Sequence, residues 1–206
     1  MTKLMYIKAS PRTGRSHSMA VADAFVAAWK AKNPGAEVLE RDLFAMDLPD
    51  FDAVSINGKY NIVHGRDFTP EEQAAWAKVV AIIDDFKQAD RYVFAVPMWN
   101  FAIPYKLKQF IDLVTQPGHT VAVTDKGYQG LLTGRKAFVA YARGGQYPAG
   151  SPAETYNHQS GYFEFWLGFV GVTDVVSVAA EGMLAPGSDE RQAAAVAKAR
   201  ELAAAF

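Results

Sequence analysis

The sequence predicts an α/β protein with a doubly wound, five-stranded parallel sheet and helices on both faces. Strand patterns and helix patterns alternate along the chain, as in sheets whose parallel strands are joined by helical crossovers. The helical segments carry apolar residues at helical spacing, which indicates that each covers the sheet with one face. No repeat, low-complexity tract or change of composition divides the chain, so we expect one domain over residues 1–206.

The first strand is predicted over residues 3–9, an apolar run, and the first helix over residues 16–32. The apolar face of this helix is formed by Met19, Ala22, Phe25, Val26 and Trp29. Asn33-Pro34-Gly35 ends it. Residues 36–43 form a second, more polar strand, which indicates a position nearer the edge of the sheet.

Residues 42–68 have no sustained period and are predicted to be a long irregular segment, typical of a lid or an interface. Six apolar residues argue against disorder there: Phe44, Leu48, Phe51, Ile56, Tyr60 and Ile62. A helix start follows, because Thr69 can cap, Pro70 suits the first helical position and Glu72 completes a capping box. This helix carries Trp76, Val79, Val80, Ile83 and Phe86 on one side.

The second half of the chain continues the alternation. The predicted strands are residues 91–96, 136–142 and 174–180, and the predicted helices are residues 102–115, about 152–170 and the C-terminal segment. Residues 119–133 are predicted to form a short hairpin that turns at Asp125-Lys126-Gly127. In the helix of residues 152–170, the apolar side is expected to be Tyr162, Phe165, Trp166 and Phe169. Ser188 is predicted to cap the last helix.

A binding site is expected just after residues 9, 96 and 142, because open parallel sheets bind ligands beyond the carboxyl ends of their strands. The first loop, "SPRTGRSHS" (10–18), offers hydroxyl groups, Arg12 and Arg15, and a helix N-terminus that suits a phosphate. It is neither a Walker loop nor a dinucleotide fingerprint, since Gly14 is its only glycine. The alternative is a capped helix start without a ligand.

The second loop lies within "VFAVPMWNFAIPYKLKQFID" (93–112) and is apolar where a surface connection is normally polar. It suits a flat amphipathic ring; the alternative is a loop buried under residues 42–68 or under a partner subunit. The third loop, "YARGGQY" (141–147), has paired glycines whose N–H groups can approach a ligand and stabilise charge on a reduced ring. Here the alternative is a plain turn. One loop that suits a phosphate and two loops that suit a flat ring together predict flavin mononucleotide (FMN).

Composition excludes several other functions. With no cysteine there is no thiol chemistry, so redox activity requires a bound cofactor. A net charge of −1 gives no general attraction to nucleic acid or acidic lipid. No apolar run is long enough to span a bilayer and the first residues lack a signal peptide, so a cytoplasmic protein is expected. The four histidines are scattered, and no metal site is expected.

These segments resemble the FMN-dependent NADH-azoreductases, which are flavodoxin-like NAD(P)H:quinone reductases. The resemblance covers nearly the whole chain through "SPR", "PMWNFAIPYKLKQFID", "GLLTGRKA", "RGG", "LGFVGVTDV" and "AEG". It implies a flavodoxin-like fold and a homodimer with one non-covalent FMN per subunit. It also implies ping-pong hydride transfer through flavin N5, from NADH or NADPH to a quinone or azo compound, with no obligatory catalytic side chain.

The resemblance also implies which residues bind the cofactor. The FMN phosphate would be held by Ser10, Ser16, His17 and Ser18, and the ring would be lined by Pro97, Met98, Trp99, Asn100 and Phe101. The far polar edge of the ring would meet Ala142, Arg143, Gly144 and Gly145. The chain departs from the family pattern at Trp99, Ala142, Gln116, Val121 and Val123, which indicates a less aromatic wall facing the ring.

Two other functions stay open. A flavodoxin-like electron carrier would shuttle single electrons and is expected to have a strongly acidic docking surface, which the balanced charge argues against. A flavin-binding protein without turnover would need the same loops as the enzyme. The apolar residues of segments 42–68 and 162–166 exceed what one small domain must bury, which favours a homodimer.

Overall fold

The computed structural model describes residues 1–206 and is centred on a five-stranded sheet in the order β2-β1-β3-β6-β7. Its strands are β1 (Lys3–Lys8), β2 (Glu37–Asp42), β3 (Arg91–Pro97), β6 (Lys136–Ala142) and β7 (Asp174–Ala180). Every neighbouring pair is parallel. The predicted α/β class is confirmed, and so is the edge position of the second strand. This order is that of flavodoxin-like sheets, with the switch point between β1 and β3.

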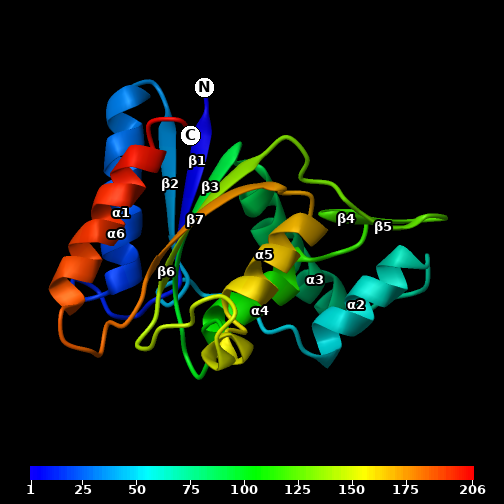
Figure 1. Cartoon of the computed structure of the whole chain (residues 1–206). Coiled ribbons are helices and arrows are strands. Elements are labelled where there is room, and N and C mark those ends of the chain that lie inside the picture. Colours follow the sequence, from blue (N-terminus) through cyan, green and yellow to red (C-terminus); the bar gives the residue numbers. More distant parts are fainter.

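Helices cover both faces of the sheet (Figure 1). On one face lie α1 (His17–Lys32) and α6 (Ser188–Leu202). The other face carries α3 (Pro70–Lys87), α4 (Tyr105–Val114) and α5 (Ser160–Phe169). Two separate apolar cores result, one on each side of the sheet. In the first, Phe25 stacks on Phe138 with ring centroids 3.8 Å apart; in the second, Phe94 meets Phe163 edge-on at 5.0 Å.

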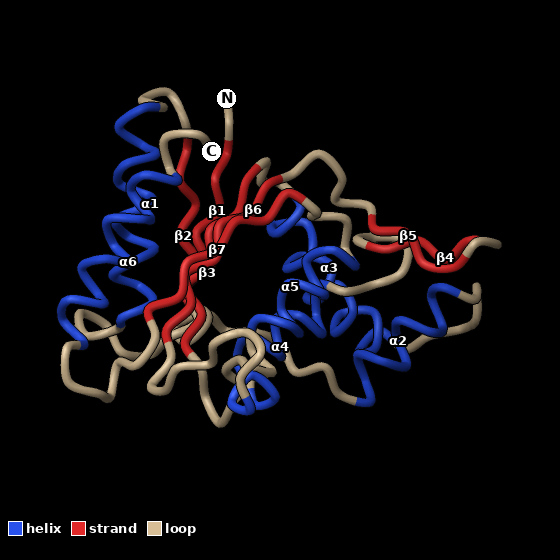
Figure 2. Tube along the Cα trace, viewed as in Figure 1, coloured by secondary structure: helices blue, strands red, loops and turns tan.

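Two elements lie outside these layers. Helix α2 (Ala53–Val63) packs against α3, and the hairpin of β4 (Val121–Thr124) and β5 (Gly127–Gly130) projects beyond the sheet (Figure 2). The hairpin turns where it was predicted to turn, at Asp125-Lys126, and Gly127 supplies a φ of 103°. The predicted capping box at the start of α3 is also confirmed, because Thr69 and Glu72 bond each other's backbone N–H groups.

The prediction of an irregular segment over residues 42–68 is wrong, because α2 lies inside it. Asp52 caps this helix by accepting a hydrogen bond from the Ser55 N–H at 2.9 Å. Only Ser55 and Gly58 of the helix are buried. At Gly58 an added Cβ would lie 2.4 Å from the Glu72 carbonyl oxygen, so backbone meets backbone there. A helix that packs through small residues has no apolar stripe for a pattern to reveal.

The helix predicted over residues 152–170 is in fact two elements, a 3-10 helix (Pro152–Tyr156) and α5. Its predicted apolar side is confirmed for Trp166, which is buried, and for Tyr162 and Phe169, which are half-buried against the core. It is wrong for Phe165, which is 68% exposed, whereas Phe163 and Leu167 are buried. The chain breaks between the two elements where Gln159 turns into the interior, at 0% exposure.

Two helix starts differ from the prediction. Ser188 is the first residue of α6 and not its cap; Gly187, with a φ of 78°, holds the cap position without a side-chain bond. Helix α4 begins at Tyr105 and not at residue 102. Ala102 pairs with Trp99, and Pro104 disfavours helical backbone at the residue before it.

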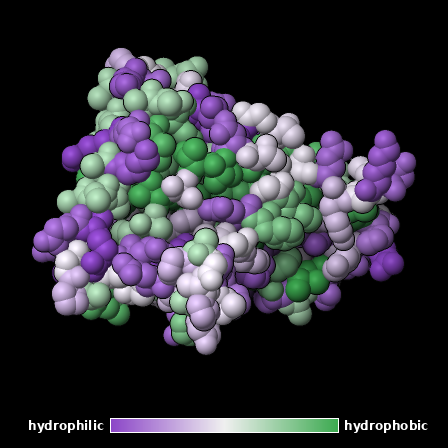
Figure 3. Space-filling model, viewed as in Figure 1, coloured by the Kyte–Doolittle hydropathy of each residue, from purple (hydrophilic) through white to green (hydrophobic).

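The surface is uneven in polarity. Figure 3 shows apolar residues gathered along the middle of the visible face, where the edge strand β7 passes between the α1/α6 layer and α5, while the tip of the hairpin is hydrophilic. None of the helices combines the length and the apolar character needed to cross a membrane.

Candidate functional site

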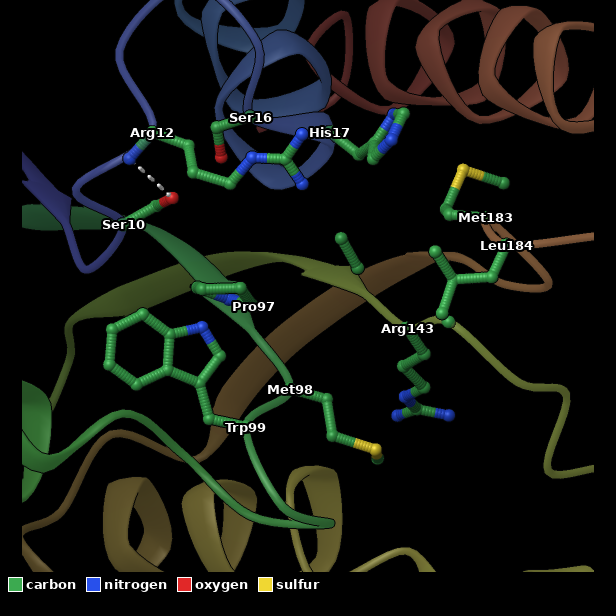
Figure 4. A pocket seen from close by; sticks show the side chains of 12 residues that line it. Ser10, Arg12, Ser16, His17, Pro97, Met98, Trp99, Arg143, Met183 and Leu184 are labelled. Carbon is green, nitrogen blue, oxygen red and sulfur yellow. Dashed lines mark hydrogen bonds between the residues drawn. The ribbon is translucent and has the colours of Figure 1, made fainter.

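The three predicted loops meet in one cavity of about 190 Å³ beyond the carboxyl ends of the strands (Figure 4). Its lining consists of Ser10, Arg12, Ser16, His17, Pro97, Met98, Trp99, Ala142, Arg143, Gly144, Met183 and Leu184. Met183 and Leu184 were not predicted. They follow β7, whose carboxyl end lies at the same edge of the sheet. The rule that ligands bind beyond the carboxyl ends of the strands would therefore have located this loop too.

Four of the predicted residues do not line the cavity: Ser18, Asn100, Phe101 and Gly145. Ser18 is fully buried, and its Oγ lies 3.2 Å from Ser16 Oγ in a hydrogen bond. The cavity is smaller than the roughly 300–1,000 Å³ of typical ligand sites, so a larger ligand would extend beyond it over exposed residues. The family departures Gln116, Val121 and Val123 do not line it either.

The first part of the site is the N-terminus of α1. Ser16 caps the helix, with its Oγ accepting from the Met19 N–H at 3.4 Å, and Ser10 Oγ accepts from the Arg12 N–H at 3.3 Å. The N–H groups of Ser16, His17 and Ser18 donate to no other group of the protein. The Arg12 side chain extends across this helix start in Figure 4. Free N–H groups, the helix dipole and a guanidinium together fit an anion.

His17 is held by the last helix. Its Nδ1 lies 2.9 Å from Oε1 of Gln192 on α6, and Gln192 Nε2 donates to the His17 carbonyl at 3.4 Å. With a carbonyl-type oxygen as its partner, Nδ1 carries a proton. Nε2 is therefore the ring atom left for a ligand.

The second part of the site is a strained turn after β3. Trp99 and Ala102 exchange backbone hydrogen bonds of 2.9 and 3.0 Å, and between them Asn100 and Phe101 both have positive φ, 46° and 70°. This is a two-residue turn that glycine would adopt without strain, and a phenylalanine there is an outlier. Such strain is typical of functional sites.

The turn is fixed on both sides. The Met98 N–H donates to the Ala142 carbonyl at 2.8 Å, which ties it to the end of β6, and the Phe101 carbonyl accepts from the His158 N–H at 3.0 Å. The ring of Trp99 lies 5.7 Å from that of Phe44 and 6.2 Å from that of Tyr105, measured between centroids. The loop after β2 therefore reaches the site through Phe44, but it leaves Asn100 and Phe101 exposed.

The third part follows β6, and here the side chain of Arg143 turns inward. Its Nε donates to Gln159 Oε1 at 2.8 Å and its Nη1 to Glu181 Oε1 at 2.6 Å, and the residue is 6% exposed. In Figure 4 the guanidinium points away from the loop of Ser10 and His17. The N–H groups of Gly144 and Gly145 have no acceptor in the protein. At Gly144 a Cβ would lie 2.7 Å from Leu184 Cδ1, so a larger residue there would have to displace the exposed Leu184 side chain.

One ionisable group beside the site has a shifted pKa. Burial raises the pKa of the Tyr141 phenol well above its usual value, and the neighbouring Glu164 carboxylate raises it further. The chain contains no group of three His, Asp or Glu side chains close enough to hold a metal ion. The arrangement therefore offers anion binding at one end and an apolar slot with free N–H groups at the other.

Comparison with known proteins agrees with this geometry. A family model described as the flavodoxin-like fold matches residues 2–205. The FMN-dependent NADH:quinone oxidoreductase of Nitratidesulfovibrio vulgaris is 50% identical over 209 residues, with all of both chains covered. An azoreductase from Bacillus anthracis superposes with a TM-score of 0.93 at 32% identity over both whole chains. An FMN-dependent NADH-azoreductase from the same species, in complex with FMN, gives 0.92 at 27% identity, covering 99% of this chain and 98% of its own.

Proposed function

This chain belongs to the flavodoxin-like fold family, and from that premise we propose that it is an FMN-dependent NADH:quinone oxidoreductase that also reduces azo compounds. In this proposal residues 1–206 act as one FMN-binding domain. The electron donor is NADH or NADPH, and the protein works in the cytoplasm, where nicotinamide donors are available.

The α1 end of the site fits the phosphate of FMN. Its free N–H groups at Ser16, His17 and Ser18, the hydroxyls of Ser10 and Ser16, and the Arg12 guanidinium are all donors. Ser18 acts through its backbone, because its side chain is fully buried. This cluster of unpaired donors is the observation that carries the assignment of an anionic cofactor.

The other end fits the flavin ring. Pro97, Met98 and Trp99 give an apolar surface on one side, with Asn100 and Phe101 at its rim, and Ala142 and Gly144 face them from the end of β6. The N–H groups of Gly144 and Gly145 have no acceptor in the protein and would stabilise negative charge on the polar edge of the ring. Arg143 supports this loop from inside and is not proposed to touch the ring through its guanidinium.

The chemistry that FMN supplies when bound is two-electron transfer in a ping-pong sequence: hydride from the nicotinamide to N5, then two electrons to the quinone or azo compound. The residues bind and orient the ring and exclude water from one of its faces. We assign no side chain as an obligatory acid or base.

A homodimer completes the proposal. Several large apolar side chains around the site are exposed in the single chain, including Phe101 at 49%, Tyr105 at 63% and Leu184 at 91%. A second copy that covers them would also enclose a ligand larger than the cavity. Sedimentation that gives only monomer at micromolar concentration would contradict this part.

The test is an anaerobic visible spectrum of the FMN-reconstituted protein, followed by addition of NADH and then of a benzoquinone. We expect bleaching to two-electron-reduced flavin without a one-electron form, then reoxidation by the quinone. A stable one-electron form, or no response to either nicotinamide, would favour an electron carrier. Binding of FMN with no steady-state NADH consumption would favour a flavin-binding protein without turnover.

A further inference from the structure

Gln159 joins two loops of the site from behind. It is fully buried in the break between the 3-10 helix and α5, and its side chain makes no capping bond to α5. Its Oε1 accepts from Arg143 Nε at 2.8 Å, and its Nε2 donates to the Val96 carbonyl at 2.9 Å. The side-chain amide therefore makes one bond on the β3 side of the slot and one on the β6 side.

The two residues that it bonds are next to the loops that form the slot. Val96 precedes Pro97-Met98-Trp99, and Arg143 precedes Gly144-Gly145. We call these contacts of Gln159 with Val96 and Arg143 the Gln159 bridge.

Arg143 extends the bridge to the fourth segment of the site, the loop after β7 that contains Glu181 and Met183. Its Nη1 donates to Glu181, its N–H donates to the Ala180 carbonyl at 2.9 Å, and its own carbonyl accepts from the Met183 N–H at 3.0 Å. Its guanidinium also lies over the rings of Tyr141 and Tyr147, 5.3 and 5.9 Å from their centroids. The position of Arg143 therefore depends on contacts from several directions, and Gln159 supplies the one that leads to β3.

We propose that Gln159 is a positioning residue, which sets the separation of the Pro97–Trp99 and Gly144–Gly145 loops and so the width of the slot. The proposal rests on the proposed function, since the slot is assigned to the FMN ring. It follows from the chemistry of the amide: an apolar side chain of equal size would fill the space but would release both the Val96 carbonyl and the Arg143 Nε–H.

The chain provides a matched control in Gln116. It is also a buried glutamine, at 1% exposure, but it lies beyond the C-terminus of α4, whose other end adjoins the site. Its Nε2 donates to the Asp112 carbonyl, and its Oε1 has no partner. Gln116→Leu removes a buried amide without touching the bridge.

The experiment measures hydrogen exchange in the FMN-free protein and the Kd for FMN. Gln159→Leu is expected to speed the exchange of segments 96–99 and 142–145 and to raise the Kd about tenfold, whereas Gln116→Leu changes neither. Gln159→Glu keeps an acceptor for Arg143 and loses the donor to Val96, so it should fall between wild type and Gln159→Leu. In an Arg143→Met background, Gln159→Leu should add less than about twofold, because the bridge is already broken.

The proposal is overturned if Gln159→Leu leaves both the exchange of the loops and the Kd at wild-type values. It is overturned equally if the effects of Gln159→Leu and Arg143→Met on the Kd are additive. Wild-type protein that binds no FMN would refute the proposed function instead, and the exchange data on the FMN-free variants would still decide whether Gln159 holds the two loops.

Discussion

The half of the site proposed to hold the FMN phosphate (the phosphate half, around Ser10, Arg12 and Ser16) and the half proposed to hold the flavin ring (the ring half, the loops after β3 and β6) are built by different means. The phosphate half is mostly local: Ser10 accepts from the Arg12 N–H, Ser16 caps α1 by accepting from the Met19 N–H, and the free N–H groups belong to one helix start. Only the pair of His17 with Gln192 joins it to a distant part of the chain. The ring half depends on residues far apart in the chain, with Val96 joined to Gln159 and Arg143 joined to Gln159 and Glu181. A local anion site can form wherever a helix begins, whereas the ring slot exists only when several segments are packed correctly.

The largest effect is expected from breaking the ring half at Arg143. Arg143→Met leaves the Gln159 amide and the Glu181 carboxylate without their partner, which should lower the free energy of unfolding by about 2–4 kcal/mol. Binding of FMN and of riboflavin should weaken together by more than about tenfold, because both ligands carry the ring. Urea unfolding and flavin fluorescence titration measure the two effects.

Lys198→Met is the control, since the ion pair of Lys198 with Glu201 is exposed on the surface of α6. It should change the free energy of unfolding by less than about 0.5 kcal/mol and leave flavin binding intact. If Arg143→Met weakened FMN binding but not riboflavin binding, the division of the site into two halves would be wrong.

Ser16→Ala breaks the phosphate half. Loss of the cap should cost about 1 kcal/mol of stability, and FMN binding should weaken about tenfold while riboflavin binding stays within about twofold. The matched control is Thr69→Ala, which removes the cap of α3 at a similar cost but lies away from the cavity. An equal loss of riboflavin affinity in Ser16→Ala would contradict the assignment of this loop to the phosphate.

Phe101→Gly relieves strain in the turn of the ring half. Glycine adopts the φ of 70° without a steric penalty, which should gain about 1 kcal/mol, less about 0.5 kcal/mol for the lost contact with the Tyr156 ring. Phe101→Ala is the control, because it removes the same ring and keeps the strain, and it should destabilise. If both variants destabilised equally in urea unfolding, the positive φ would carry no measurable strain.

The same difference between local and long-range contacts explains how much of the structure could be predicted from the sequence. The strands, the capping box, the hairpin turn and the loop of Ser10 to Ser18 follow from patterns within a few residues. Helix α2 was missed because its packing depends on the close approach of Gly58 to Glu72, which leaves no local pattern. Gln159 was missed for a similar reason: its partners lie 63 and 16 residues away in the chain.

The smallest effect concerns Tyr141, whose phenol adjoins the ring half and donates to Glu164 at 3.3 Å. Burial raises its pKa above the usual 10, so the folded state favours the neutral phenol. Its contribution to stability is complete below pH 10 and is lost as the pH rises beyond that value, when the unfolded chain ionises first. Tyr141→Phe should cost less than about 1 kcal/mol at pH 7 and should flatten the loss of stability between pH 9 and 11, measured by urea unfolding.

Tyr6→Phe removes a buried phenol bonded to Asp23 on the phosphate side, and it tests whether alkaline pH destabilises that side too. Because burial raises the pKa of Tyr6 as well, the two variants should flatten the curve in the same direction. A curve unchanged by Tyr141→Phe would mean that its phenol titrates alike in the folded and unfolded chains.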